Sequence, residues 1–172
     1  MRKLVVSFCM MVMTLSLSTT LMAQKYGHLN AGNLLQELPA VKAANAELET
    51  YQKQLVGKGE EMAKAFQTKL QAYLTKAEGG ELSKVQMQQQ ETGLQSERES
   101  IMKYEQEVIN KVQVKRQALL EPILKKVDEA IQAVGKENGY QMIFDTSVMN
   151  AILFVKDSDD VTSLVKKKLG LQ

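Results

Sequence analysis

The chain has 172 residues, of which 22 are basic and 20 acidic, and this length suits one domain or a small body with a long projection. Only 5% of the residues are aromatic and none is tryptophan, so a compact core of this size would be poorly filled. The composition therefore favours an elongated helical protein. The nearly balanced charge argues against nucleic acid as the main partner, because such a partner needs a basic face.

Residues 1–23 have the pattern of a secretory signal. Arg2-Lys3 supplies the positive start, residues 4–17 are largely apolar, and Leu21-Met22-Ala23 precedes a cleavage site before Gln24. The alternative is an uncleaved membrane anchor. We favour cleavage, because the apolar run is shorter than the ~20 residues that a membrane span needs and is interrupted by Ser and Thr.

Removal of this segment changes the composition of the mature chain. Cys9 is the only cysteine and leaves with the segment, so no disulfide and no thiol nucleophile are expected. Arg2 and Lys3 leave as well, and the remaining 20 basic and 20 acidic residues give a formal charge of zero. The mature chain is therefore expected to lack a broad electrostatic attraction for any partner.

The first part of the mature chain predicts a short strand and a short helix. The strand covers about residues 25–29, and Asn30 caps a helix that carries Leu34, Leu35 and Leu38 until Pro39 ends it. His28, in the strand, is the only histidine, so it has no second histidine or cysteine with which to build a metal or catalytic site.

A long antiparallel helical hairpin is predicted between Pro39 and about Asn138. Strong helix formers dominate this stretch, and Gly79-Gly80 is the best place for the chain to reverse. Pro39 and Pro122 lie about 40 residues to either side of that tip, so each arm helix projects on the order of 60 Å from one base. The second helix is expected to continue past Pro122 and to stop at Asn138-Gly139.

Apolar residues follow the hairpin at helical spacing. Ile109, Leu120 and Ile131 recur every eleven residues and predict a seam along the second helix. The pattern thins between Ser83 and Glu99, so the outer arm is expected to be mobile.

Gly57 and Gly59 mark a predicted hinge. Six residues are candidate contacts for a bound partner, or else only hold the two helices together: Met62, Phe66, Tyr73, Leu82, Met87 and Leu94.

The C-terminal part predicts two strands joined by a turn, at residues 140–145 and 151–155, followed by a helix from Val161 to Leu169. The acidic residues from Asp157 to Asp160 suggest either a cation-binding loop or, as we prefer, the cap of that last helix. Apolar residues here outnumber what a small body can bury alone, which predicts self-association. The candidate contacts between copies are Leu29, Ile143, Ile152 and Phe154.

The predicted fold class is mostly α with a small β body. The domain scheme has a signal peptide at 1–23, a body formed by residues 24–38 and 123–172, and a hairpin tentacle at 39–122.

The ordered set of motifs resembles the Skp, or OmpH-like, family of periplasmic chaperones. The similar stretches are YGHLNAGNLLQELP before the hairpin, GYQMIFD at residues 139–145, the following hydrophobic strand, and Asp160-Val161-Thr162 leading to Lys168-Leu169. The resemblance implies a homotrimer in the periplasm. Its strands would form a central barrel, and its three tentacles would enclose a cavity that holds unfolded outer-membrane proteins. The tentacles of the best-known members are markedly basic, whereas these are neutral, so charge does not indicate membrane-surface contact.

The functional prediction is a holdase chaperone for unfolded outer-membrane β-barrel proteins. The alternative is a secreted coiled-coil spacer or scaffold with a fixed partner. An enzyme is not expected, because the sequence shows no nucleophile–base pair, no metal-ligand spacing and no phosphate-binding glycine loop, and neither metal nor cofactor is predicted.

Overall fold

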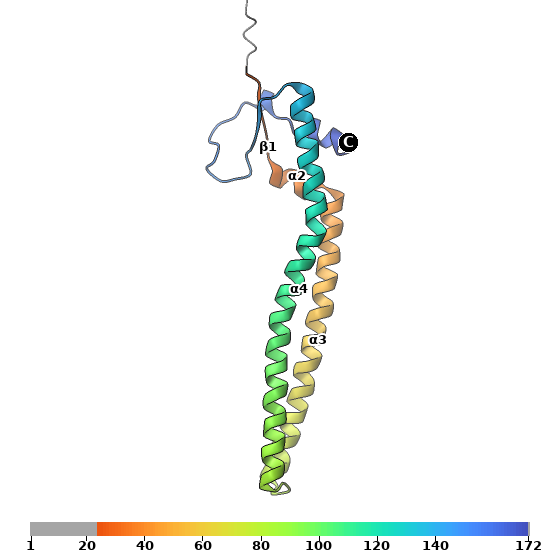
Figure 1. Cartoon of the computed structure of the whole chain (residues 1–172), viewed down its shortest axis with the longest axis vertical. Helices are drawn as coiled ribbons and strands as arrows, with labels where there is room; N and C mark the ends of the chain where they lie inside the picture. Colours follow the sequence, from red (N-terminus) through yellow and green to blue (C-terminus); the bar gives the residue numbers. More distant parts are fainter. Residues whose placement is uncertain (1–23, 172) are drawn as a thin grey trace, which may run out of the picture.

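The structure is a computed structural model that describes residues 24–171, and the predicted signal segment lies outside the described residues. Two long helices form a hairpin that projects from a small body, in which both ends of the described chain meet (Figure 1). The fold is therefore mostly helical with a small β component, as the sequence predicts.

The hairpin consists of α3, Pro39–Glu78, and α4, Lys84–Asn138. The 40 residues of α3 span about 60 Å at 1.5 Å per residue. At the tip, the Gly79 N–H donates to the Thr75 carbonyl at 3.0 Å, and Gly80 has a φ of 67°, which favours glycine. Ser83 then begins α4 with a reciprocal capping box to Gln86. Local capping chemistry thus accounts for the reversal.

The helix α4 is continuous through Pro122 and ends as the sequence predicts. Its C-cap is Gly139, which has a φ of 70° and whose N–H donates to Gly135 O. The C-terminal end of α4 extends beyond the start of α3 and so has no hairpin partner (Figure 1). It instead forms one wall of the body.

The sheet of the body has two strands rather than the predicted three. β1, Tyr26–Leu29, pairs in parallel with β2, Met142–Asp145, with Tyr26 opposite Met142. The predicted strand at residues 151–155 is wrong, because this segment forms turn and coil. The segment lies in a loop that projects away from the two-stranded sheet (Figure 1), so its β-type composition does not lead to strand pairing. The predicted hairpin between the two C-terminal strands is therefore replaced by pairing between the two chain ends.

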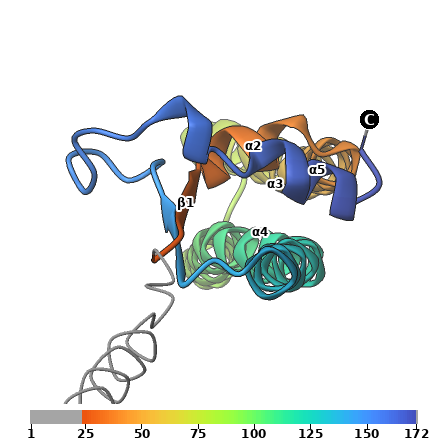
Figure 2. The same cartoon turned by 90° about the horizontal axis from the view of Figure 1, so that it is seen from above.

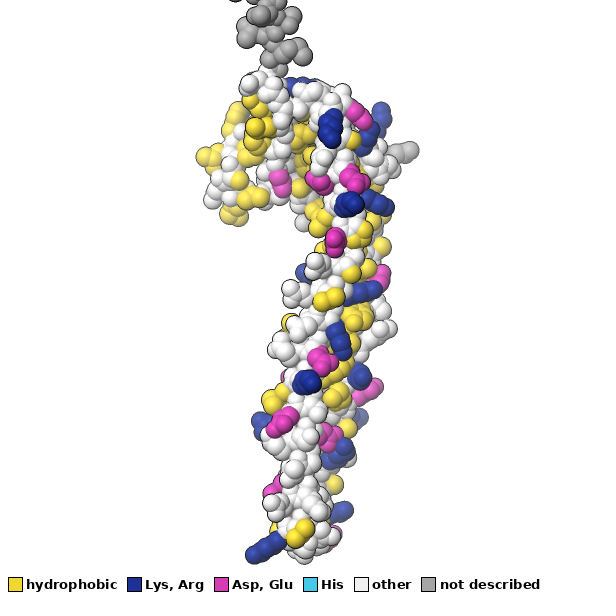
Figure 3. Space-filling view, in the orientation of Figure 1, with side chains coloured by type: hydrophobic (Ala, Val, Ile, Leu, Met, Phe, Trp, Pro, Cys, Tyr) yellow, Lys and Arg dark blue, Asp and Glu magenta, His cyan; other side chains and the backbone are white. Residues whose placement is uncertain are grey.

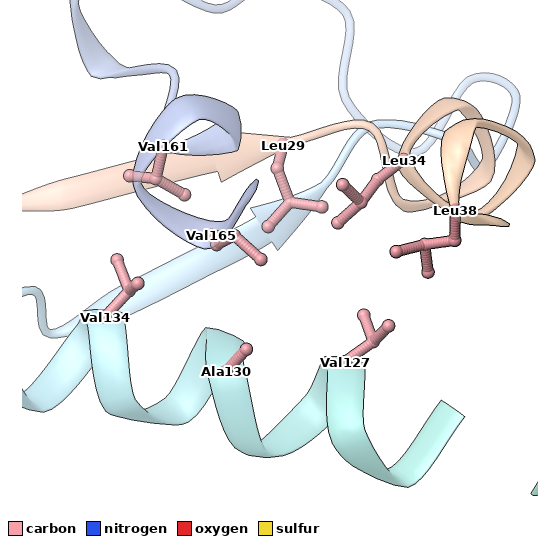
Figure 4. Packing of buried hydrophobic residues seen from close by; sticks show 8 residues of the cluster. All are labelled: Leu29, Leu34, Leu38, Val127, Ala130, Val134, Val161 and Val165. Atoms are coloured by element: carbon pink, nitrogen blue, oxygen red, sulfur yellow. The ribbon is translucent and has the colours of Figure 1, made fainter. Parts of the chain in front are cut away.

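The core of the body lies between α4 and three elements from opposite ends of the chain: β1, α2 (Ala31–Glu37) and α5 (Thr162–Lys168). Seen from above, α4 lies on one side and α2 and α5 lie on the other (Figure 2), and the core side chains fill the space between them (Figure 4). Eight residues form this core: Leu29, Leu34, Leu38, Val127, Ala130, Val134, Val161 and Val165.

The contact between β1 and α5 requires glycine at position 27. A Cβ atom on Gly27 would stand 2.8 Å from Cγ1 of Val161 and 3.0 Å from the Tyr140 ring, closer than carbon atoms pack. Because Gly27 has no side chain, the strand approaches Val161 closely enough to bury it completely.

The acidic run before α5 acts partly as the sequence predicts. Asp157–Asp159 forms a short 3-10 turn, and Oδ1 of Asp160 accepts a hydrogen bond from the Thr162 N–H at 2.7 Å. In the described part of the chain, no group of three or more His, Cys, Asp or Glu side chains is placed to hold a metal ion. Asp160 thus pairs the first amide of α5 from one residue before the N-cap position, which is Val161 and makes no side-chain cap hydrogen bond.

Tyr104 is the most deeply buried side chain in the middle of the arm. It is 9% exposed, and its hydroxyl donates to Leu55 O at 3.0 Å. Its ring lies beside Gly59, where an added Cβ would stand at an ordinary contact distance of 3.5 Å. Gly57, by contrast, has no atom within 4 Å of such a position, apart from its own helix and chain neighbours. Of the two glycines in the predicted hinge, only Gly57 has empty space where a side chain would begin.

The hinge at Gly57 and Gly59 stays a prediction, and replacement of both glycines by alanine tests it. Both methyl groups fit without displacing neighbours. We expect the double variant to gain about 1–2 kcal/mol of helical stability and to slow hydrogen exchange across residues 55–65. If exchange in the unmodified protein is already as slow there as at residues 110–120, the hinge does not exist.

Candidate functional site

A loop between β2 and the 3-10 turn carries the most exposed apolar side chains of the body. Leu153 and Phe154 are 88% and 81% exposed, and Val148 and Met149 lie outside the core as well. The apolar side chains gather on the projecting side of the body (Figure 3). Exposed apolar patches of this kind are candidates for interaction surfaces.

The first end of this loop is held by the Asp145 carboxylate. It accepts hydrogen bonds from the Ala31 N–H at 3.1 Å and from the Ser147 N–H at 2.8 Å, and the Ser147 hydroxyl donates to its second oxygen. Partial burial would raise the pKa of Asp145, but these hydrogen bonds outweigh burial and hold the pKa below its ordinary value. Asp145 therefore fixes the point at which the loop leaves the sheet.

The second end is held by His28. Its Nε2 lies 2.9 Å from Lys156 O, and its own carbonyl accepts from the Val161 N–H at 2.9 Å. Burial would raise the pKa of nearby Asp160, yet hydrogen bonds from Thr162 and the charges of His28 and Lys166 lower it overall. The only histidine of the sequence thus has a structural role in anchoring the loop.

Between the loop and the sheet lies an open apolar groove of about 390 Å³. The rings of Tyr26 and Phe144 form one side, with centroids 6.2 Å apart, and Ile152, Phe154 and Val155 line the other side. An apolar groove and an apolar protrusion thus lie next to each other on the same chain.

The four candidate contacts between copies have different positions. Leu29 is 2% exposed and packs in the core of its own chain, so its side chain has no surface to offer another copy. Ile143 is half-buried against the same core, whereas Ile152 lines the groove and Phe154 is exposed on the loop. Only Ile152 and Phe154 therefore lie where a second chain can reach them.

The six candidate contacts on the arm are half-buried rather than exposed. The arm is also joined by polar contacts between its helices. The Tyr73 hydroxyl donates to Glu91, which raises the Tyr73 pKa, and Lys69 Nζ lies 2.8 Å from Oε1 of Glu97. The six residues therefore expose only part of their surface to solvent, and their role as contacts for a bound partner stays a prediction.

Sequence reasoning missed the apolar side chains that α4 exposes most. Ile109 is 59% exposed although its eleven-residue spacing placed it in the seam, and Val114 is 67% exposed. The others on this helix are Val85, Met102 and Leu124. A helical wheel centred on Tyr104, which does face α3, would have found Met102 and Ile109 off the contact face.

Charge along the arm is mixed, and several charges are paired. Basic and acidic side chains alternate over the visible face (Figure 3). Lys115 lies 2.6 Å from Glu47 across the hairpin, and Lys53 lies 2.6 Å from Glu49 on α3. Opposite charges this close cancel beyond their neighbours at physiological salt. None of the helices within residues 24–171 combines the length and apolar character needed to cross a membrane.

These features define a class of protein: a long, mixed-charge helical hairpin mounted on a small body with an exposed apolar loop. The family model described as outer membrane protein (OmpH-like) matches residues 25–169. The chain belongs to the OmpH-like family.

A solved structure agrees with this assignment at the level of the fold. The chain is similar to a protein from Caulobacter crescentus CB15 whose crystal structure is described as that of a proposed outer membrane chaperone (OmpH-like). The TM-score is 0.73 at 18% identity, over 85% of this chain and 83% of the other. A search of curated proteins found no match.

Proposed function

We propose that the protein is a periplasmic holdase chaperone that binds unfolded outer-membrane β-barrel proteins and prevents their aggregation. The main support is an arm about 60 Å long whose solvated helix α4 exposes scattered apolar side chains. Family membership and the described role of the similar Caulobacter protein favour the same function. The signal-like segment at residues 1–23 supports export to the periplasm.

Unfolded barrel strands need this kind of protection. Their faces alternate between apolar and polar, and their unpaired edges pair with other chains when exposed. A holdase must cover such a chain through many weak contacts and then release it. Separated apolar side chains on a polar helix supply weak contacts, and methionines such as Met102 adapt to varied partners.

We infer that three copies assemble through their bodies, with the arms surrounding a shared cavity. The loop of one copy, with Phe154 at its surface, would cover the groove beside Tyr26 and Phe144 of the next. A protrusion that fits a different surface of its neighbour makes a head-to-tail contact, and such contacts form a ring when the rotation between neighbours closes after three copies. In this arrangement the body is residues 24–38 and 123–172, and residues 39–122 form the tentacle.

Apolar contact rather than charge is expected to supply the affinity for the client. The mature chain is formally neutral, and its opposite charges lie close together along the arm. Burial of apolar surface contributes roughly 25 cal/mol per Å², less the cost of ordering a mobile arm, and salt does not screen it. The protein should therefore hold a urea-unfolded barrel almost equally well at about 50 and about 500 mM salt, a range within which the screening length falls through about 10 Å.

Light scattering measures how far the protein prevents aggregation of a barrel diluted from urea. A fluorescent label on the barrel measures its affinity for the protein across the same salt range. Met87→Ser with Leu94→Ser should weaken holding more than neutralisation of Lys53 and Lys64, without changing the solution mass. A tenfold or larger loss of affinity across the salt range would show that charge dominates. If no unfolded barrel is held at all, the spacer or scaffold function replaces the chaperone function.

A further inference from the structure

The outer arm contains a groove built around Gly93 on α4. The groove has a volume of about 480 Å³ and runs between the two helices. Ala72 and Tyr73 of α3 line it together with Gly93 and Leu94 of α4. Small side chains lie beside large apolar ones here, so the surface is hollowed where the two helices face each other.

Packing within the described chain does not explain the glycine at this position. An interior helical glycine costs about 1 kcal/mol relative to alanine. Gly93 has no atom within 4 Å of the place where a Cβ would stand, apart from its own helix and chain neighbours. This differs from Gly27, whose position a side chain cannot occupy, and from Gly59, which the Tyr104 ring approaches. What Gly93 supplies is bare helix backbone that faces the groove.

The rim of the groove determines the chemistry of its occupant. Lys69 is paired with Glu97 at 2.8 Å, so these two charges neutralise each other. The Gln90 carboxamide at the edge offers both hydrogen-bond donors and an acceptor, as a peptide backbone does. Lys76 contributes one further cation. A rim this close to neutral suits an uncharged segment with unpaired backbone groups, rather than an acidic peptide.

The length of the groove suits an extended chain. From Lys69 to Lys76 the helix rises about 10 Å, which matches roughly three residues of a strand at 3.3 Å each. In an extended segment of that length, alternate side chains point the same way. One apolar side chain can therefore contact Tyr73 and Leu94 while the client backbone passes over Gly93, where Cα–H···O contacts are available.

We propose that the Gly93 groove binds a short, neutral, extended segment of an unfolded outer-membrane β-barrel strand, with the client backbone against Gly93. This site rests on the proposed holdase function and specifies what the arm recognises: strand-like backbone with alternate apolar side chains.

The test compares Gly93→Ala with Gly57→Ala in the full mature protein. Both glycines are interior helical residues with open surroundings, so both substitutions should stabilise and stiffen the arm to a similar degree. Only Gly93→Ala places a methyl group in the groove. We expect it to weaken binding of the urea-unfolded barrel about three- to tenfold, with Gly57→Ala close to wild type.

A second pair of variants separates filling of the groove from stiffening. Ala72→Leu adds bulk to the groove wall, whereas Ala63→Leu adds the same bulk to an exposed site elsewhere on α3, and alanine and leucine have similar helix propensities. Ala72→Leu should weaken binding and Ala63→Leu should not. The proposed groove site is wrong if Gly57→Ala and Gly93→Ala lose equal affinity for the barrel, or if Ala72→Leu binds it as well as wild type. Either result leaves the holdase function intact. Absence of binding by the wild-type protein would overturn both.

Discussion

Phe154→Asp is expected to convert the assembled protein into monomers while leaving the helical content nearly unchanged. Phe154 is 81% exposed on the body loop and makes no contribution to the core of its own chain, so the substitution costs the single chain little. In the proposed assembly the new carboxylate would be buried in an apolar contact without a partner, which is strongly unfavourable. Sedimentation of the mature protein at micromolar concentration measures the outcome.

The matched control for this variant is Val114→Asp. Val114 is also an exposed apolar residue, but it lies on the arm, away from the loop and its groove. This variant should keep the wild-type mass in sedimentation. The proposed assembly is wrong if the unmodified mature chain is itself monomeric, or if both aspartate variants dissociate equally.

Leu34→Ala should destabilise the body by about 2–5 kcal/mol, as large-to-small changes at fully buried positions do. Leu34 is 0% exposed and lies where α2 meets the rest of the core. Hydrogen exchange of the Thr146 and Val161 amides reports this directly, because each donates to a carbonyl of β1. Both amides should exchange faster in the variant, whereas exchange in the middle of the arm should stay as it is.

Leu124→Ala is the control for the core substitution. Leu124 is half-exposed on α4, outside the buried cluster, so its truncation should cost less than about 1 kcal/mol. If Leu34→Ala leaves the Thr146 and Val161 amides as protected as before, the buried cluster does not hold the two chain ends together.

The boundaries of the helices were predictable because their signals are local. Gly79 ends α3, Ser83 caps α4, Gly139 stops α4 and Asn30 starts α2, each through hydrogen bonds within a few residues. These contacts depend on neighbours that the sequence displays directly. The projecting hairpin and its attachment to a body therefore follow from the sequence alone.

The strand pairing and the exposure of individual apolar side chains were less predictable, because both depend on residues that are far apart in the sequence. The segment 151–155 has strand-like composition, but composition does not show whether a segment lies beside the edge of a sheet, and this one lies in a projecting loop. Leu29 resembles Phe154 in being apolar and near the body strands, yet one is in the core and the other is exposed. Helical spacing likewise does not distinguish an apolar seam from an exposed stripe when the register between the helices is unknown.

The parallel pairing of β1 with β2 has a consequence for the order of folding. The Leu29 carbonyl accepts a hydrogen bond from Thr146, 117 residues later in the chain, so the body requires closure of a very long loop. The hairpin needs much shorter closures, such as the 18 residues between Tyr73 and Glu91, and its contacts can spread from the tip. During synthesis from the N-terminus, the arm can thus form while β1 still waits for its partner. The surface proposed to join copies is completed last, which limits association between unfinished chains.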